Sequence, residues 1–104
     1  MNRLEFNDLV DATHRHVLLL NGTKGADYSG DEDVLWNFRH AAERLGLTSE
    51  LIWAVYAGKH WDAIMAYCCR GKVESEPVAG RITDLILYLH LLRAMVWERG
   101  SAES

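Results

Sequence analysis

Apolar residues recur every three or four positions along most of the chain, which is the spacing of one face of an α-helix. The first such stretch runs from Leu4 to about Leu20. A segment rich in Gly, Asn, Asp and Ser follows from Asn21 to Asp33, and these residue types end helices and accept unusual backbone angles. We therefore expect an amphipathic helix and then a Gly- and Asp-rich loop over residues 22–33.

A second apolar face runs from Val34 to Leu45. Asp31 or Asp33 could cap the start of this short helix, because an aspartate side chain accepts hydrogen bonds from the first backbone amides. Gly46 suits its C-terminal end, where a left-handed residue often stands.

A third helix is expected from Leu51 to about Cys69, with Thr48 or Ser49 as its cap and Gly71 at its end. A fourth helix should have Pro77 in its first turn and run to about Arg99. It should stop at Gly100, and residues 100–104 should form a frayed tail.

No sustained alternation of apolar and polar residues predicts a strand. Four helices with short links indicate an all-α, compact four-helix bundle-like fold. The whole chain of 104 residues is interpreted as one domain. The fourth helix carries apolar residues around more than one stripe, so part of it, with Trp53 and Trp61, is expected in the interface of a homo-oligomer.

Composition and charge exclude several partners. The formal net charge of -4, with acids and bases interleaved, disfavours duplex nucleic acid. No apolar run is long enough for a membrane span and the start lacks signal-peptide features, so we expect no membrane partner and a cytoplasmic location. The two cysteines, Cys68 and Cys69, are adjacent and fit neither a stapling disulfide nor a zinc site.

The segment from Asn21 to Asp33 and the helix after it hold a dense set of polar and aromatic residues. Basic side chains can bind phosphate, glycines let a ligand approach the backbone, and an aromatic ring can stack on a base. The candidates are Lys24, Asp27, Tyr28, Asp33, Trp36, Asn37 and Arg39. No Walker or GxGxxG pattern is present, so a solvated turn is the alternative interpretation.

Two further places in the sequence could carry chemistry. Lys59 and His60 follow Gly58 inside the third helix, where a glycine is costly and indicates close helix packing or the approach of a ligand. In the fourth helix Asp84 and Tyr88 share a side with Arg81. Asp84 could bind a ligand hydroxyl or a metal, or form an ion pair with Arg81 or Lys59.

With these residues in view, the chain resembles small bacteriophage proteins of unassigned role, near the nucleotide-modification-associated and MazG-like all-helical nucleotide-handling families. The resemblance spans roughly Gly22 to Glu98 and rests on three short blocks. These are Lys24 with Asp27-Tyr28-Ser29, Asp33 and Asn37-Phe38-Arg39; Lys59-His60; and Arg81-Ile82-Thr83-Asp84 with Tyr88.

The resemblance implies a nucleotide-like ligand in the host cytoplasm, if the chain is phage-encoded. One departure matters, since the first aspartate of the family's D-x-x-x-D pair falls at Gly80 and only Asp84 remains. Loss of one acid weakens divalent-metal binding, which favours capture over cleavage. The leading interpretation is therefore a protein that sequesters a nucleotide-derived small molecule, such as a cyclic nucleotide or cyclic ADP-ribose-like immune signal, without catalytic residues, metal or cofactor.

Two other functions stay open. A Mg²⁺-dependent MazG-like nucleotide pyrophosphohydrolase, or a nucleotide-modifying enzyme, would hold its metal with Asp27, Asp84 and a further acid. A protein-protein interaction module would use the apolar fourth helix and need no pocket.

Overall fold

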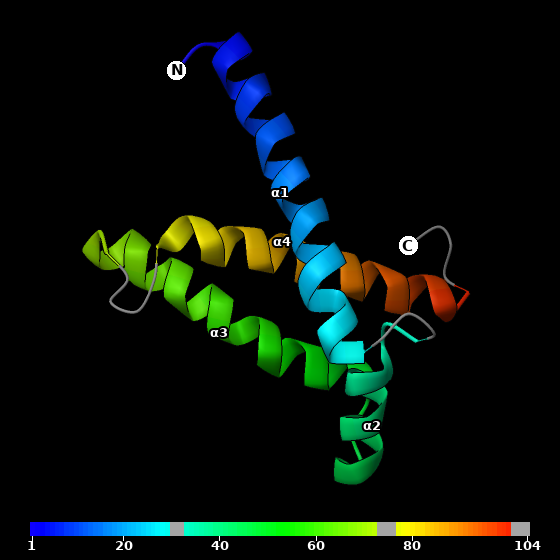
Figure 1. Ribbon diagram of the computed structural model, residues 1–104. Helices are drawn as coiled ribbons and strands as arrows, with labels where there is room; N and C mark the ends of the chain where they lie inside the picture. The colour runs from blue at the N-terminus through cyan, green and yellow to red at the C-terminus, as the bar shows by residue number, and fades with distance from the viewer. Residues whose placement is uncertain (30–32, 73–76, 101–104) are drawn as a thin grey trace.

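The computed structural model describes residues 1–29, 33–72 and 77–100, with the side chains of residues 24–29 left out (Figure 1). This part of the chain contains four helices and no strand, so the all-α prediction is confirmed. The helices are α1 (Arg3–Ser29), α2 (Trp36–Leu45), α3 (Ser49–Arg70) and α4 (Val78–Glu98).

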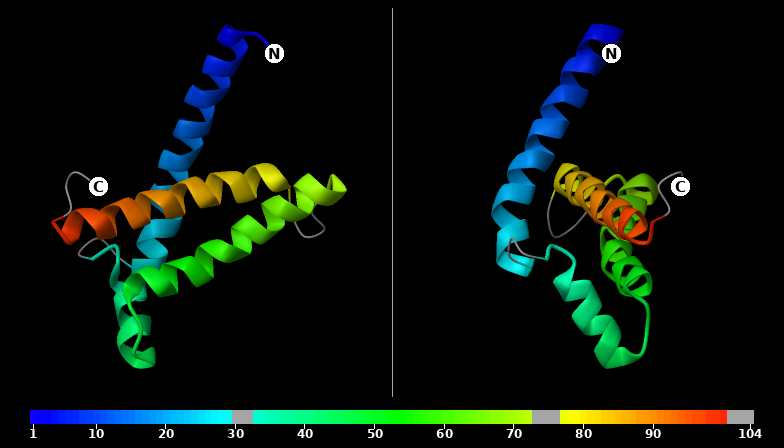
Figure 2. Two further views of the ribbon diagram at one scale, coloured as in Figure 1. Left: turned by 180° about the vertical axis from the view of Figure 1, so that it is seen from behind. Right: turned by 90° about the vertical axis from the view of Figure 1, so that its right-hand side faces the viewer.

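Helices α3 and α4 lie side by side and run in opposite directions, and α2 packs under the first half of α3 (Figure 2). The last part of α1 crosses α4, whereas its N-terminal part extends beyond the other helices. The radius of gyration is 15.5 Å, against about 13 Å for a compact chain of this length. Helices α2 to α4 therefore pack compactly, and the first half of α1 forms a projecting arm.

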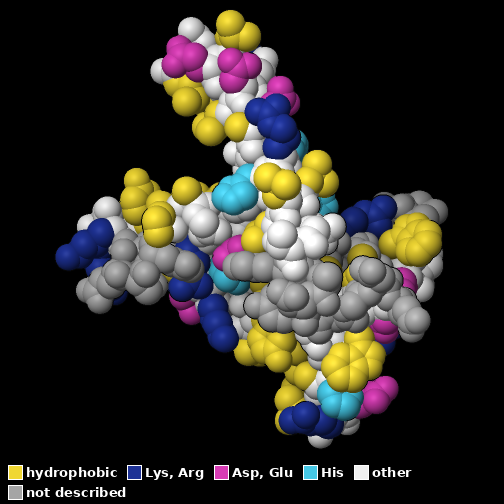
Figure 3. All heavy atoms as spheres, in the orientation of Figure 1, with side chains coloured by type: hydrophobic (Ala, Val, Ile, Leu, Met, Phe, Trp, Pro, Cys, Tyr) yellow, Lys and Arg dark blue, Asp and Glu magenta, His cyan; other side chains and the backbone are white. Residues whose placement is uncertain are grey.

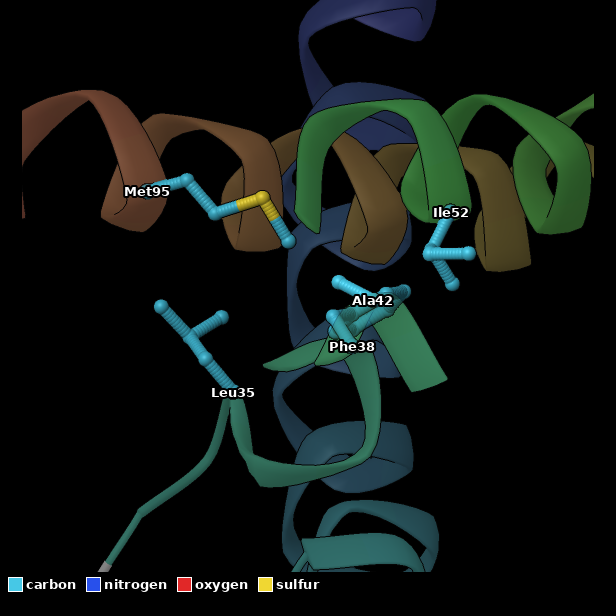
Figure 4. Packing of buried hydrophobic residues seen from close by; sticks show 5 residues of the cluster. All are labelled: Leu35, Phe38, Ala42, Ile52 and Met95. Atoms are coloured by element: carbon cyan, nitrogen blue, oxygen red, sulfur yellow. The ribbon is translucent and has the colours of Figure 1, made fainter. Parts of the chain in front are cut away.

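A small hydrophobic core lies where α2, α3 and α4 meet. It contains Leu35, Phe38, Ala42, Ile52 and Met95, each at most 5 % exposed (Figure 4). Leu35, Phe38 and Ala42 are spaced by three and four residues, which is why one face of α2 turns inward, toward Ile52 of α3 and Met95 of α4. The core is thin, because most large apolar side chains of the described chain remain half-buried or exposed.

The ends of the helices follow the predicted chemistry. Thr48 caps α3 through a hydrogen bond from the Leu51 amide to its hydroxyl, and Gly46 and Gly71 adopt left-handed conformations after α2 and α3. Pro77 precedes the first residue of α4, and Gly100, also at positive φ, follows its end.

The start of α2 differs from the capping prediction. The α2 N-cap is Leu35, without a side-chain cap bond, although the Asp33 carboxylate does accept a hydrogen bond from the Leu35 amide. Asp31, the other proposed cap, lies outside the described residues.

The expected loop does not begin at residue 21 or 22, because α1 continues to Ser29. A glycine inside a helix costs only about 1 kcal/mol relative to alanine, so Gly22 and Gly25 do not by themselves end one. The Thr23 hydroxyl also binds back to the Leu19 and Leu20 carbonyls, as in a continuing helix. Of the predicted loop, residues 30–32 lie outside the description.

Large apolar side chains are exposed on all four helices, including the projecting arm (Figure 3). Trp61 is 55 % exposed. Trp53, by contrast, is half-buried, and its indole Nε1 donates to the backbone carbonyl of Tyr88 at 2.6 Å. Trp53 therefore contributes to the packing of α3 on α4 within the chain. No described helix has the length and apolar character needed to cross a membrane.

Candidate functional site

A group of polar side chains lies between the middle of α3 and the first half of α4. His60 Nδ1 is 3.7 Å from Oδ2 of Asp84 and 3.4 Å from Nη1 of Arg81. The His60 ring also lies tilted against the ring of Tyr88, with their centroids 5.1 Å apart. We call His60, Arg81, Asp84 and Tyr88 the α3–α4 polar cluster.

The helical repeat explains why these four residues meet. Arg81, Asp84 and Tyr88 are three and four residues apart, so they stand on one side of α4, as the sequence predicts. Because α3 runs antiparallel to α4, its His60 comes opposite this side. The side chains of His60 and Asp84 are only 14 % and 18 % exposed, so the cluster is largely shielded from water.

The cluster offers complementary chemistry for a small polar ligand. A guanidinium presents several donors that match phosphate oxygens, a carboxylate accepts from hydroxyl or amino groups, and an imidazole can do either. Lys59 precedes His60 on α3 and supplies a cation in addition to Arg81. Its side chain is exposed, with the ammonium 6.0 Å from the centre of the Tyr56 ring. With two basic residues and one acidic residue, the cluster and Lys59 together favour an anionic ligand.

Arg39 and Asp33 form a separate group near the C-terminal end of α4. Arg39 donates to the Asp33 carboxylate at 2.5 Å and also binds Glu98. The hydrogen bond with Glu98 raises the pKa of Arg39, and the nearby charge of Asp33 acts in the same direction. Its guanidinium is thus already engaged by two carboxylates, which competes with phosphate binding.

The aromatic and amide candidates of α2 lie with this second group. Trp36 is half exposed and stacks on His40, with ring centroids 4.5 Å apart and planes within 11°. Asn37 follows on the same helix and is partly exposed. Trp36 offers a flat aromatic surface, but it belongs to the Arg39 end of the molecule.

The structure therefore divides the site that the sequence predicts. Glu98, which binds Arg39, is fourteen residues beyond Asp84 on α4, and that separation is about 21 Å along a helix. His60, Asp84 and Tyr88 come together, and Lys59 is the residue before His60 on α3, whereas Asp33, Trp36, Asn37 and Arg39 gather elsewhere. The side chains of Lys24, Asp27 and Tyr28 lie outside the described residues.

A cleft of about 210 Å³ opens beside the second group, lined by Leu35, Arg39, Ser49, Glu50, Met95, Glu98 and Arg99. On its wall Arg99 holds Glu50 in a bidentate pair, with Nη2 2.7 Å from Oε1. This hydrogen bonding lowers the pKa of Glu50 and raises the pKa of Arg99. No local pattern predicts this pair, because the two residues are 49 positions apart and join α3 to the C-cap of α4.

Among the side chains that the structure describes, no three His, Cys, Asp or Glu residues come close enough to hold a metal ion. Cys68 and Cys69 are exposed free thiols near the end of α3. Asp84 has His60 beside it, but no second described carboxylate forms a divalent-metal site with it.

No family model, curated protein or solved structure matches this chain.

Proposed function

We propose that this protein captures an anionic, nucleotide-derived small molecule at the α3–α4 polar cluster and holds it without cleaving it. The observation that carries the proposal is the position of His60 between Arg81 and Asp84, at 3.4 and 3.7 Å, on two facing helices. A donor and an acceptor held this close, in largely shielded surroundings, suit a ligand that combines phosphates with hydroxyl or amino groups.

Each residue takes a role that follows from its chemistry. Arg81 and Lys59 neutralise phosphate, with Arg81 supplying paired donors and Lys59 a flexible point charge. Asp84 accepts hydrogen bonds from ribose hydroxyls or a base amino group. His60 forms a hydrogen bond with a neighbouring ribose or base edge of the ligand. The ring of Tyr88, beside His60, gives the ligand an aromatic contact. A cyclic nucleotide or a cyclic ADP-ribose-like signal has this combination of groups, and the resemblance to phage proteins favours that class.

The proposal does not use Arg39, which is bound by two carboxylates about four helical turns away along α4. It also does not depend on a metal ion. A Mg²⁺-dependent enzyme instead requires turnover and a metal dependence, so one experiment can separate the two functions.

The purified protein is incubated with cyclic dinucleotides, cyclic ADP-ribose isomers and nucleoside triphosphates, each with Mg²⁺ and with a chelator. It is then separated from free ligand and heated, and the released compound is identified by mass spectrometry. We expect one compound to be released unchanged in both conditions. A converted product that forms only with Mg²⁺ would assign the enzyme function instead.

Four variants connect binding to the α3–α4 polar cluster. Lys59→Ala and Asp84→Asn should each weaken binding by roughly tenfold or more, which corresponds to one lost charged interaction. Lys72→Ala, just after α3, and Arg93→Ala, on α4, each remove an exposed cation. Both should leave the affinity for the ligand within about twofold of the wild type. Equal affinity in all four variants, with binding intact, would move the ligand to another part of the chain.

A further inference from the structure

The outward face of α3 carries a row of apolar residues from Leu51 to Met65, interrupted by Asp62. Leu51, Val55, Gly58, Trp61 and Met65 are spaced by three and four residues and therefore share one side of the helix. The four large side chains among them are 41–64 % exposed. We call these five residues the outer stripe. In the described chain α3 packs against α4 and α2 through its other side, and α1 does not contact it.

Gly58 stands at the middle of the outer stripe, inside a helix, where it costs about 1 kcal/mol relative to alanine. We expected a packing reason for this glycine, yet a Cβ placed there would meet no described atom within 4 Å. Close helix packing within the chain therefore does not require it. A second helix could approach closely at this position, because Gly58 presents no side chain.

The outer stripe is self-complementary about Gly58. In an antiparallel pair with its twofold axis at Gly58, positions whose numbers sum to the same value face each other. Val55 of one copy then lies opposite Trp61 of the second, and Leu51 lies opposite Met65. The acidic residue on this face, Asp62, falls opposite Ala54 and has Lys59 one turn away on its own helix.

The chain as a whole exposes more surface than a compact monomer of its mass. Its accessible surface is 7635 Å², whereas a folded monomer of 11.8 kDa exposes about 5,900 Å². Part of the excess of about 1,700 Å² belongs to the projecting arm of α1. A standard interface covers about 800 Å² on each partner, so the excess is large enough for one.

We propose that the outer stripe of α3 is the contact between two copies of this chain, packed antiparallel with the twofold axis at Gly58. This interface is on the side of α3 opposite the core and does not depend on the ligand proposed above. Two Gly58 backbones meet at the axis, and Trp61 of each copy fills the space beside Val55 of the other.

Cysteine cross-linking tests the position of the axis. In a background with Cys68→Ser and Cys69→Ser, Gly58→Cys brings two thiols together at the axis, within the Cα separation of about 7 Å that a disulfide allows. Mild oxidation should give a covalent dimer on a non-reducing gel. Gly80→Cys is the matched control, because Gly80 also lies in a helix with open space around it but off the stripe. It should stay monomeric on the same gel.

A second variant separates folding from association. Gly58→Leu adds a side chain whose Cβ has no described atom of the same chain within 4 Å, and leucine has a higher helix propensity than glycine. The variant should therefore keep its helical circular dichroism. At the axis the same side chain blocks contact, and sedimentation equilibrium should show dimerisation weakened by roughly tenfold or more. Gly80→Leu should associate like the wild type.

Two results would overturn the proposal. The first is a wild-type chain that sediments as a monomer at about 100 μM, because a stable interface would give a dimer at this concentration. A wild-type dimer in which Gly58→Cys does not cross-link and Gly58→Leu still associates would place the contact on another surface, such as the α1 arm. Neither result affects the release of a nucleotide from the heated protein. The dimer proposal and the proposed function can therefore be disproved independently of each other.

Discussion

The imidazole Nδ1 of His60 lies 3.7 Å from Oδ2 of Asp84, so a residue of α3 and a residue of α4 share a polar contact in largely buried surroundings. Such neighbours should not act independently on stability. We expect a double-mutant cycle of His60→Gln and Asp84→Asn, followed by urea unfolding, to give a coupling energy of about 0.5 kcal/mol or more. His60→Gln combined with Glu43→Gln, an exposed acid on α2, should be additive. Additivity in both cycles would contradict a direct His60–Asp84 contact.

Trp53 should be the tryptophan that most affects stability. Its indole bonds to the Tyr88 carbonyl and its ring packs against the core, so Trp53→Phe removes this hydrogen bond between the helices and part of the packed ring. We expect the free energy of unfolding in urea to fall by about 1–3 kcal/mol. Trp97→Phe is the control, since Trp97 is 65 % exposed and the change should stay within about 0.5 kcal/mol. Equal losses would argue against a special role for the indole hydrogen bond.

The cap of α3 distinguishes two residues that the sequence left as alternatives. The Thr48 hydroxyl accepts the Leu51 amide at 3.2 Å, and Ser49 is the first helical residue. Thr48→Ala should therefore lower the free energy of unfolding by about 1 kcal/mol. Ser49→Ala should change it by less than about 0.5 kcal/mol in the same thermal or urea unfolding experiment. A larger loss from Ser49→Ala would mean that the cap is one residue later.

Gly22 tests whether α1 continues past the residues that predict a loop. It lies inside α1, and no atom of the described side chains comes within 4 Å of a Cβ placed there. Gly22→Ala should raise helical ellipticity and increase the free energy of unfolding by up to about 1 kcal/mol. Gly46→Ala, at φ 68, is the opposite control and should destabilise, because alanine disfavours that left-handed backbone. A loss of stability from Gly22→Ala would restore the loop interpretation.

The Glu50–Arg99 pair predicts a pH dependence. The hydrogen bond from Arg99 lowers the pKa of Glu50 below its usual value of 4.5, so the folded state binds this proton less readily than the unfolded state. The stabilisation is therefore present above pH 4.5 and is lost as the pH falls through the lower folded-state pKa. Glu50→Gln should have a lower Tm than the wild type at pH 7, and the difference should shrink toward pH 3. Glu43→Gln, an exposed acid on α2, should show a smaller pH-dependent difference.

The sequence by itself determined the helices, because their signals are local. Apolar spacing predicted the four helices, Gly46 and Gly71 ended α2 and α3, and Thr48 began α3, each through backbone chemistry within a few residues. The predicted end of the first helix at Asn21 was wrong, because α1 continues to Ser29. That prediction depended on small differences in helix propensity, which are weaker than the cooperativity that extends an existing helix.

The grouping of side chains was decided only by the tertiary structure. The spacing of Arg81, Asp84 and Tyr88 placed them on one side of α4, but nothing local shows that His60 faces them or that Arg39 joins Glu98. Those contacts depend on how α2 and α4 pack around Phe38 and Ile52, which sets the register between residues far apart in sequence. The same packing turns Trp53 inward and leaves Trp61 on the outer stripe, although both lie on α3, because only one side of a helix can face the core.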